Sequence, residues 1–231
     1  MSPHRHRRRG SRAVAIAERS GWAPVDPVDD DYRAVRAGAT LLIGDDPDVR
    51  AFPEELWVSA TLERGAGSVR VGIPSPQTYP RPLVSRALRI EKSQPELTYA
   101  YLWLALPAVL PSVSIARRSI LSSPMGRIDH GMLDERFTFH PPGRRGKLTS
   151  RGDNPRERAY DAHLRELFGP ATDVLLDAPN VFTRLGIVGH RLYAVTEVDA
   201  DRIEAAADLL LELRAALPER VLRRYGDDAR R

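Results

Sequence analysis

A stretch of twenty residues without a charge, Leu97 to Ala116, constrains the fold of this chain more than any other feature. A segment of that length is long enough to cross a membrane as a helix. Pro107 and Pro111 would break such a helix twice, because proline lacks an amide proton and its ring clashes with the preceding turn. Residues 99–106 instead carry apolar side chains on both faces of an extended chain, a pattern typical of a strand buried on both sides. The sequence therefore predicts a central strand here and no membrane span.

Shorter strands are predicted around this central one. Apolar and polar residues alternate in residues 56–62 and in 69–73, and the flexible loop between the two runs predicts a hairpin. Asp30 or Asp31 can cap a short helix that runs through Arg36 and ends at Gly38. Further strands are predicted at residues 40–43, 112–116 and 137–139.

The last third of the chain predicts two amphipathic helices and a hairpin between them. Asn154 and Pro155 have the order of a helix start, and Gly169-Pro170 marks the end of that helix. A second helix is expected over residues 200–217, with apolar residues on one face. Between the helices, residues 184–188 and 191–196 flank Gly189-His190, a pair with glycine first, as a type II′ turn requires.

These elements together predict an α+β fold. Strands mostly neighbour strands in the chain, which favours an antiparallel sheet over a parallel wound one. We expect that sheet to be packed by an N-terminal helix over residues 12–20 and by the two C-terminal amphipathic helices. The predicted organisation is a basic flexible arm (1–10), a single domain (11–225) and a flexible tail (226–231).

Several short motifs resemble domain-of-unknown-function proteins of high-GC, actinobacterial-type bacteria. They are Gly21-Trp22 after an arginine-flanked helix, the Leu-Pro pairs at 106–107 and 110–111, and Asp134, Arg136 and Phe137 in a D-x-RF element. The resemblance implies an α+β domain without a known active site. Relatives in that group often carry a membrane anchor ahead of the domain, where this chain has its basic arm.

The charge of the chain is concentrated in that arm. The formal net charge is +4, yet residues 1–21 hold six arginines against one glutamate, so the remainder is close to neutral. Such an arm attracts nucleic acid, acidic proteins or anionic lipid, or serves as a solvated terminus. The candidate anion and nucleic-acid contacts are Arg5, Arg7, Arg8, Arg9 and Arg12 in the arm, with Arg220, Arg223 and Arg224 near the C-terminus.

No residue pattern predicts a catalytic centre or a cofactor. The chain has no cysteine, which excludes disulfides and thiolate metal sites and is typical of a cytoplasmic protein. Asp129, His130, Asp134 and His140 are metal-ligating residue types, but their spacing fixes no geometry. We therefore predict no metal ligand and no cofactor-binding residue.

Three functions follow as hypotheses. The first is a non-enzymatic interaction domain that binds a protein partner through a sheet edge or the proline-rich loop. The reason is that the sequence predicts a well-formed apolar core and contains no catalytic motif. The second is a nucleic-acid-binding accessory protein that uses the arm. The third is an enzyme whose site is assembled from distant residues such as Asp129, His130 and Arg136.

Overall fold

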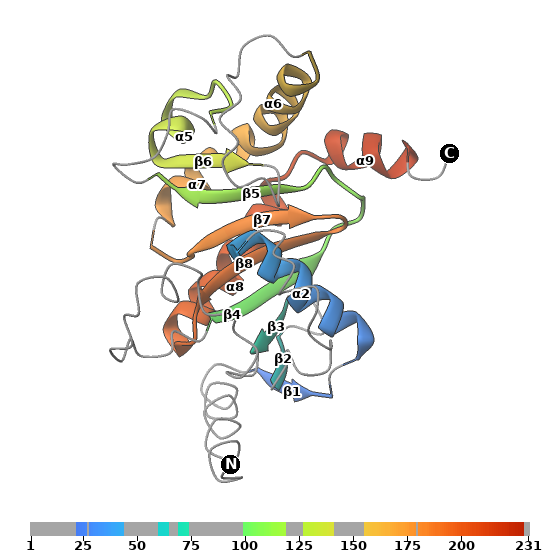
Figure 1. Ribbon diagram of the computed structural model, residues 1–231, viewed down its shortest axis with the longest axis vertical. Helices are drawn as coiled ribbons and strands as arrows, with labels where there is room; N and C mark the ends of the chain where they lie inside the picture. The colour runs from blue at the N-terminus through green and yellow to red at the C-terminus, as the bar shows by residue number, and fades with distance from the viewer. Residues whose placement is uncertain are drawn as a thin grey trace, which may run out of the picture.

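The computed structural model describes eight stretches of the chain, which contain eight strands in one antiparallel sheet. The stretches are residues 22–26, 28–43, 60–64, 69–73, 99–118, 127–140, 155–178 and 180–228. The strands are β1 (Ala23–Val25), β2 (Ala60–Arg64), β3 (Val69–Ile73), β4 (Tyr99–Ala105), β5 (Val113–Arg117), β6 (Phe137–His140), β7 (Arg184–Val188) and β8 (Arg191–Glu197). They lie in the order β1-β2-β3-β4-β8-β7-β5-β6 (Figure 1).

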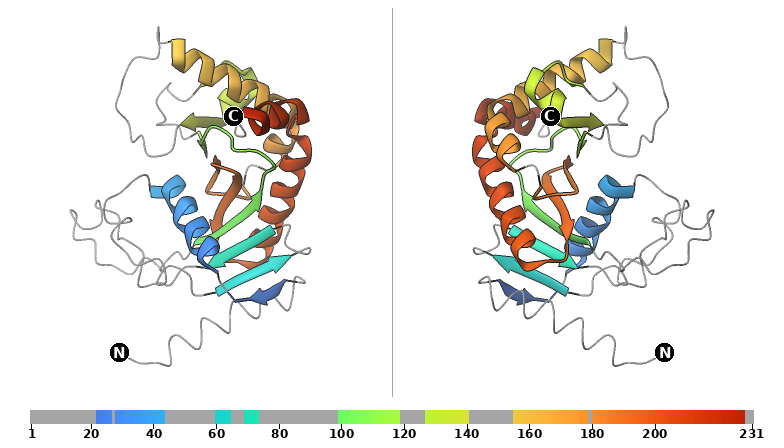
Figure 2. Two further views of the ribbon diagram at one scale, coloured as in Figure 1. Left: turned by 90° about the vertical axis from the view of Figure 1, so that its right-hand side faces the viewer. Right: turned by 90° about the vertical axis from the view of Figure 1, so that its left-hand side faces the viewer.

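Helices cover both faces of this sheet. They are α2 (Asp29–Ile43), α5 (Gly131–Arg136), α6 (Pro155–Phe168), the 3-10 turn η3 (Gly169–Ala171), α7 (Thr172–Asp177), α8 (Ala200–Ala216) and α9 (Glu219–Asp228). Figure 2 shows α2 on one side of the sheet and α8 on the other. The predicted α+β class, an antiparallel sheet packed by helices from the N-terminal and C-terminal parts of the chain, is confirmed, with α2 as the N-terminal helix of the described residues. Of the helices in these stretches, none is both long and apolar enough to cross a membrane.

The central strand is β4, as its composition predicts. Ala100, Leu102 and Leu104 join the larger apolar cluster on the α8 side of the sheet. Tyr101 and Trp103 point the other way and join the smaller cluster under α2. The apolar side chains on the two faces of β4 are therefore covered by helices on both sides of the sheet, as are those of the neighbouring strand β8.

The C-terminal hairpin separates β4 from β5, although the two strands follow one another in the chain. The predicted hairpin is present, with β8 paired to β4 and β7 paired to β5. Gly189 opens its turn with a φ of 61°. The connection from β4 to β5 crosses this turn, because the amide of Leu106 donates to the carbonyl of His190 (2.7 Å) and that of Leu110 to Gly189 (3.0 Å).

Helix α2 corrects two sequence predictions. The helix was expected to end at Gly38 and to be followed by a strand over residues 40–43, but α2 continues unbroken to Ile43. Ala39 and Leu41 in this last part are buried with Tyr101 and Tyr193 of the sheet. The same apolar residues would satisfy either a strand or a helix, and packing on the sheet selects the helix.

Glycines allow α2 to lie directly on the sheet. A Cβ atom on Gly72 in β3 would stand 2.3 Å from Cγ2 of Val35, and one on Gly38 in the helix 2.9 Å from Cδ1 of Tyr101. A Cβ on Gly186 in β7 would stand 2.9 Å from Leu41. Any larger residue at these positions would push the helix away from the sheet.

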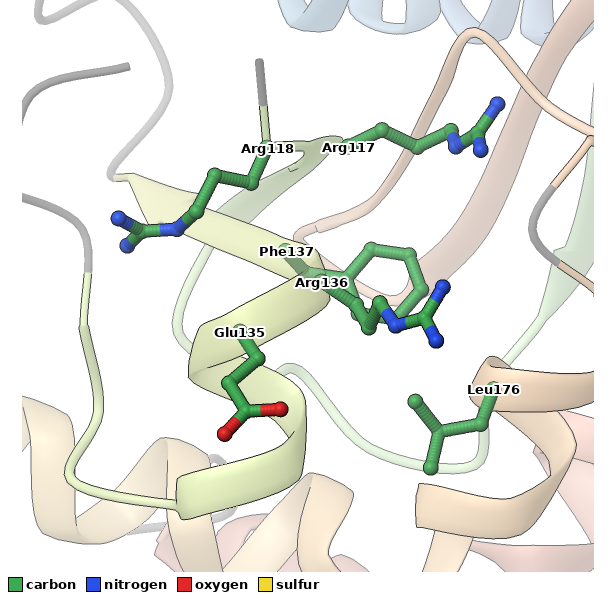
Figure 3. Close-up of a pocket in the computed structure, with 6 residues that line it drawn as sticks. All are labelled: Arg117, Arg118, Glu135, Arg136, Phe137 and Leu176. Atoms are coloured by element: carbon green, nitrogen blue, oxygen red, sulfur yellow. The ribbon is translucent and has the colours of Figure 1, made fainter. Parts of the chain in front are cut away.

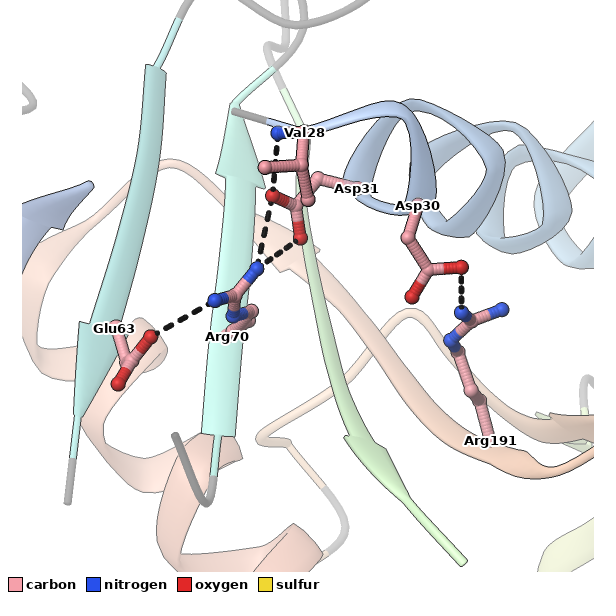
Figure 4. A network of polar contacts seen from close by, with 6 residues as sticks. All are labelled: Val28, Asp30, Asp31, Glu63, Arg70 and Arg191. Carbon is pink, nitrogen blue, oxygen red and sulfur yellow. Dashed lines mark hydrogen bonds and ion pairs between the residues drawn. The ribbon is translucent and has the colours of Figure 1, made fainter. Parts of the chain in front are cut away.

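A buried carboxylate fixes the first turn of α2 (Figure 4). Asp31 is 1 % exposed, and one of its oxygens accepts the amide of Val28 (3.0 Å). Both oxygens also accept Nη1 of Arg70 in β3 (2.7 and 2.9 Å), and Nη2 of the same guanidinium donates to Glu63 in β2 (3.1 Å). The hydrogen bond to Asp31 raises the pKa of Arg70. At the next position of the helix, Asp30 pairs with Arg191 of β8.

The C-terminal helices agree with their predicted bounds. The first is α6 (155–168), and the second, α8, ends at residue 216, one residue before the predicted end. Asp199 caps α8 by accepting the amide of Arg202 (3.2 Å). Helix α9 runs to Asp228, past the predicted start of the tail at residue 226. The helix predicted at residues 12–20, the strand residues 56–59 and the arm lie outside the described residues.

We expect Gly72→Ala to lower the free energy of unfolding by about 1–3 kcal/mol, since the added Cβ overpacks against the stiff Val35 side chain. Urea titration followed by circular dichroism measures this. Gly131→Ala is the control, because a Cβ there meets nothing within 4 Å. Equal stability of both variants would show that α2 does not depend on close contact with the sheet.

We expect Asp31→Asn to cost about 2–4 kcal/mol, because it leaves the partly buried Arg70 without its main counter-charge. Asp30→Asn should cost less than about 1 kcal/mol, since the Asp30 side chain is 63 % exposed. The same urea titration compares the two variants. If both variants lost similar amounts of stability, the burial of Asp31 would not explain the importance of its ion pair.

Candidate functional site

The loop that enters α5 is held by one carboxylate. Asp134 is 8 % exposed and accepts the amides of Ile128 (2.7 Å) and His130 (2.8 Å), one on each oxygen. Asp129 between them has a φ of 56°, a left-handed conformation that aspartate tolerates better than most residues. Asp134 therefore has a structural task here, and its two oxygens are already engaged by the backbone.

The residues that were considered as metal ligands do not form a cluster. His130 instead contacts Thr172 of α7, with 3.4 Å between Nε2 and Oγ1. His140 lies at the far end of β6. Throughout the described stretches, no three His, Cys, Asp or Glu side chains are grouped so that they could hold a metal ion.

A hollow of about 130 Å³ lies where α5 passes into β6 (Figure 3). Its lining residues come from β5, α5, β6 and α7: Arg117, Arg118, Glu135, Arg136, Phe137 and Leu176. The register of the sheet brings them together, because Arg117 pairs with Phe137 and the amide of Arg118 donates to the carbonyl of Arg136 (2.7 Å). The side chains of Arg117 and Arg136 extend to the same side as Leu176, and Arg118 extends to the opposite side (Figure 3).

The hollow has an excess of positive charge. Nη1 of Arg117 donates to the neutral amide oxygen of Asn180 (2.6 Å). Nε and Nη2 of Arg118 are buried without a hydrogen-bond partner. The Leu176 side of the hollow therefore carries the positive charges of Arg117 and Arg136 (Figure 3).

The hollow adjoins a sheet edge with unpaired backbone groups. Arg118 and Arg136 form a hydrogen-bonded pair of the antiparallel β5–β6 ladder. In such a ladder, hydrogen-bonded pairs alternate with pairs whose backbone N–H and C=O groups point away from the neighbouring strand. Phe139 belongs to a pair of the second kind, so its N–H and C=O point away from β5. No other strand of the described stretches pairs with β6 on that side. Phe137 stacks on Phe182 (6.1 Å between ring centroids) and Phe139 packs on Phe168 at a tilt of 47° (5.9 Å), and these contacts hold this edge on the core.

The opposite edge of the sheet is protected. The edge strand there, β1, has three residues, and Pro24 at its centre has no amide proton to donate. Short length and proline are common means of preventing edge-to-edge pairing. Strand β6 has neither proline nor lysine, so the two edges differ in their ability to receive another strand.

The predicted arginine contacts near the C-terminus are paired with carboxylates. Both Nη atoms of Arg224 bond to Glu166 of α6 (3.0 and 3.1 Å), and Nε of Arg220 lies 3.6 Å from the same carboxylate. Arg223 pairs with Glu219 one turn away (2.7 Å). The two contacts with Glu166 dock α9 on α6, whereas the Arg223–Glu219 pair lies within α9. The arm arginines Arg5, Arg7, Arg8, Arg9 and Arg12 lie outside the described residues.

His163 completes the contact between α6 and α9. Its Nδ1 lies 3.0 Å from the hydroxyl of Tyr225, and its Nε2 is buried without a partner. Burial lowers the pKa of His163; the charge of Glu166 raises it and that of Arg224 lowers it further. The imidazole is therefore neutral at pH 7.

Of the residues around the hollow, the sequence hypotheses included only Arg136, as part of an assembled enzyme site. Arg117 and Arg118 follow the predicted strand directly, which marks them as the end of that strand and not as a site. Leu176 and Asn180 are about sixty residues away in the chain. The sequence has no periodic signal that joins these positions, because they meet only through strand pairing.

Comparison with protein-family models, with curated proteins and with solved structures gives no match to this chain.

We expect the protein to lose stability as the pH falls below about 6.5, the ordinary pKa of histidine, because the unfolded chain then binds a proton that folded His163 excludes. His163→Gln removes this titration. As the pH falls from 6.5 to the lowered pKa, the free energy of unfolding of the wild type should therefore decrease relative to that of the variant by up to about 1.4 kcal/mol per pH unit. Urea titrations at pH 5 and pH 7.5 measure it. If the difference between the two proteins did not change with pH, His163 would have the same pKa in the folded and the unfolded state.

Proposed function

We propose that this protein is a non-enzymatic, cytoplasmic interaction domain that binds an extended segment of a partner protein along β6. The observation that supports this proposal is the outward N–H and C=O of Phe139 on an edge strand that no other described strand pairs with on that side. Addition of a strand to such an edge is a common mode of peptide recognition, in which main-chain hydrogen bonds supply affinity.

Side-chain selectivity would come from the groups beside that edge. The arginine-lined hollow lies at the start of β6, and Met132 of α5 is 56 % exposed. A segment placed along β6 would thus meet cationic groups near one end.

The ion pairs of α9 favour a protein partner over nucleic acid. Binding to a phosphate backbone depends on arginines that are free to neutralise phosphates. Arg220 and Arg224 share Glu166, and Arg223 has Glu219, so these three would first have to give up intramolecular partners.

A photo-reactive amino acid at position 132 tests the proposal in the native cells. We expect it to form a covalent adduct with a partner protein, because α5 leads directly into the edge strand. The same amino acid at Val109, which is 52 % exposed in the connection between β4 and β5, is the matched control and should give no such adduct.

Hydrogen exchange of the captured complex then locates the contact. We expect the Phe139 amide to become protected in the complex relative to the free protein. Equal adduct yields at positions 132 and 109, no adduct at position 132, or protection that omits Phe139 would each contradict strand addition at β6.

A further inference from the structure

We infer that the hollow lined by Arg117, Arg118 and Arg136 binds a dianionic phosphoryl group. This inference deepens the proposed function and rests on it in one respect, namely that the group would be a phosphorylated side chain of the segment on β6. The binding of the group itself depends only on the hollow.

The arginines of this hollow are available to a ligand. None of the three has a carboxylate partner among the described residues, in contrast to Arg70 and Arg224, each of which is paired. Arg117 and Arg136 are exposed at their ends and extend to the same side (Figure 3). Planar guanidinium groups present several N–H donors in a fork that matches phosphate oxygens, which makes arginine the usual residue at phosphate sites.

Arg118 adds positive charge behind the hollow. Its Nε and Nη2 are buried and have no hydrogen-bond partner. Because its side chain extends to the side opposite Arg117 and Arg136, Arg118 would attract an anion bound there through its charge and not by direct contact (Figure 3).

Charge and size both select a phosphoryl group. Arg117 and Arg136, which extend to the same side, carry a joint charge of +2, which matches the charge of about −1.5 to −2 that a phosphomonoester carries at pH 7 (Figure 3). A carboxylate would leave an uncompensated positive charge. The volume of about 130 Å³ is several times the roughly 10–15 Å³ that one water requires, so a tetrahedral phosphoryl group fits.

Titration of the full-length protein with O-phosphoserine, followed by the amide resonances of Arg118, Arg136 and Phe137, tests the inference. We expect saturable shifts at these amides and a roughly tenfold or greater weakening in Arg117→Gln and in Arg136→Gln, because each loses charge-assisted hydrogen bonds. Both side chains are exposed, so both variants should fold. Arg214→Gln on α8 removes an equally exposed arginine and should bind as the wild type does.

The pH dependence tests the charge of the ligand. The second pKa of a phosphomonoester is about 6, so affinity should increase from pH 5 to pH 7.5, whereas acetate should bind far more weakly at both. Absence of saturable shifts, unchanged affinity in both hollow variants, equal binding of acetate, or affinity that does not rise with pH would each overturn the inference.

The outcomes for the two proposals are separable. If O-phosphoserine does not bind but position 132 still captures a partner that protects Phe139, strand addition stands and the phosphoryl site does not. If O-phosphoserine binds and no partner is captured, the phosphoryl site stands without the proposed segment.

Discussion

The antiparallel pairing of β4 with β8 is the interaction on which the rest of the structure depends. It joins a first half-sheet, β1 to β4, to a second one made of β8, β7, β5 and β6. Seven residue pairs form along it, from Tyr99↔Glu197 to Ala105↔Arg191. Both apolar clusters include residues of both strands, so loss of this pairing would open the two cores together.

The covering of β4 on both faces follows from that pairing. On one face, α8 packs its apolar residues over Leu102 and Leu192 in the larger cluster. On the other, α2 lies over Tyr101 and Tyr193, at a distance that Gly38 and Gly72 permit. The Asp31–Arg70 pair then fixes α2 along the sheet. Buried ion pairs contribute little net stability but penalise alternative arrangements, which suits the role of a positional lock.

The candidate site is a further product of the sheet register. Arg117 and Arg136 are separated by the loop and helix that lead into β6, and the pairing of β5 with β6 sets them side by side. Phenylalanine stacking on one side and the Asp134 bonds on the other keep the α5–β6 junction in place. The backbone that carries Arg117 and Arg136 is therefore held in place by sheet pairing and by packing on the core.

What the sequence determined by itself is the set of local elements. The two-sided apolar pattern of residues 99–106, the glycine-first pair at 189–190 and the Asp199 cap each specify their element through short-range physics. The sequence did not determine the conformation of residues 40–43, because a threonine followed by three apolar residues suits a strand or a helix until a sheet surface is present. The order of strands and the meeting of Arg117 with Arg136 were decided only in the tertiary structure. These depend on contacts between residues far apart in the chain, and the local patterns of a sequence carry no record of which distant partner a strand will choose.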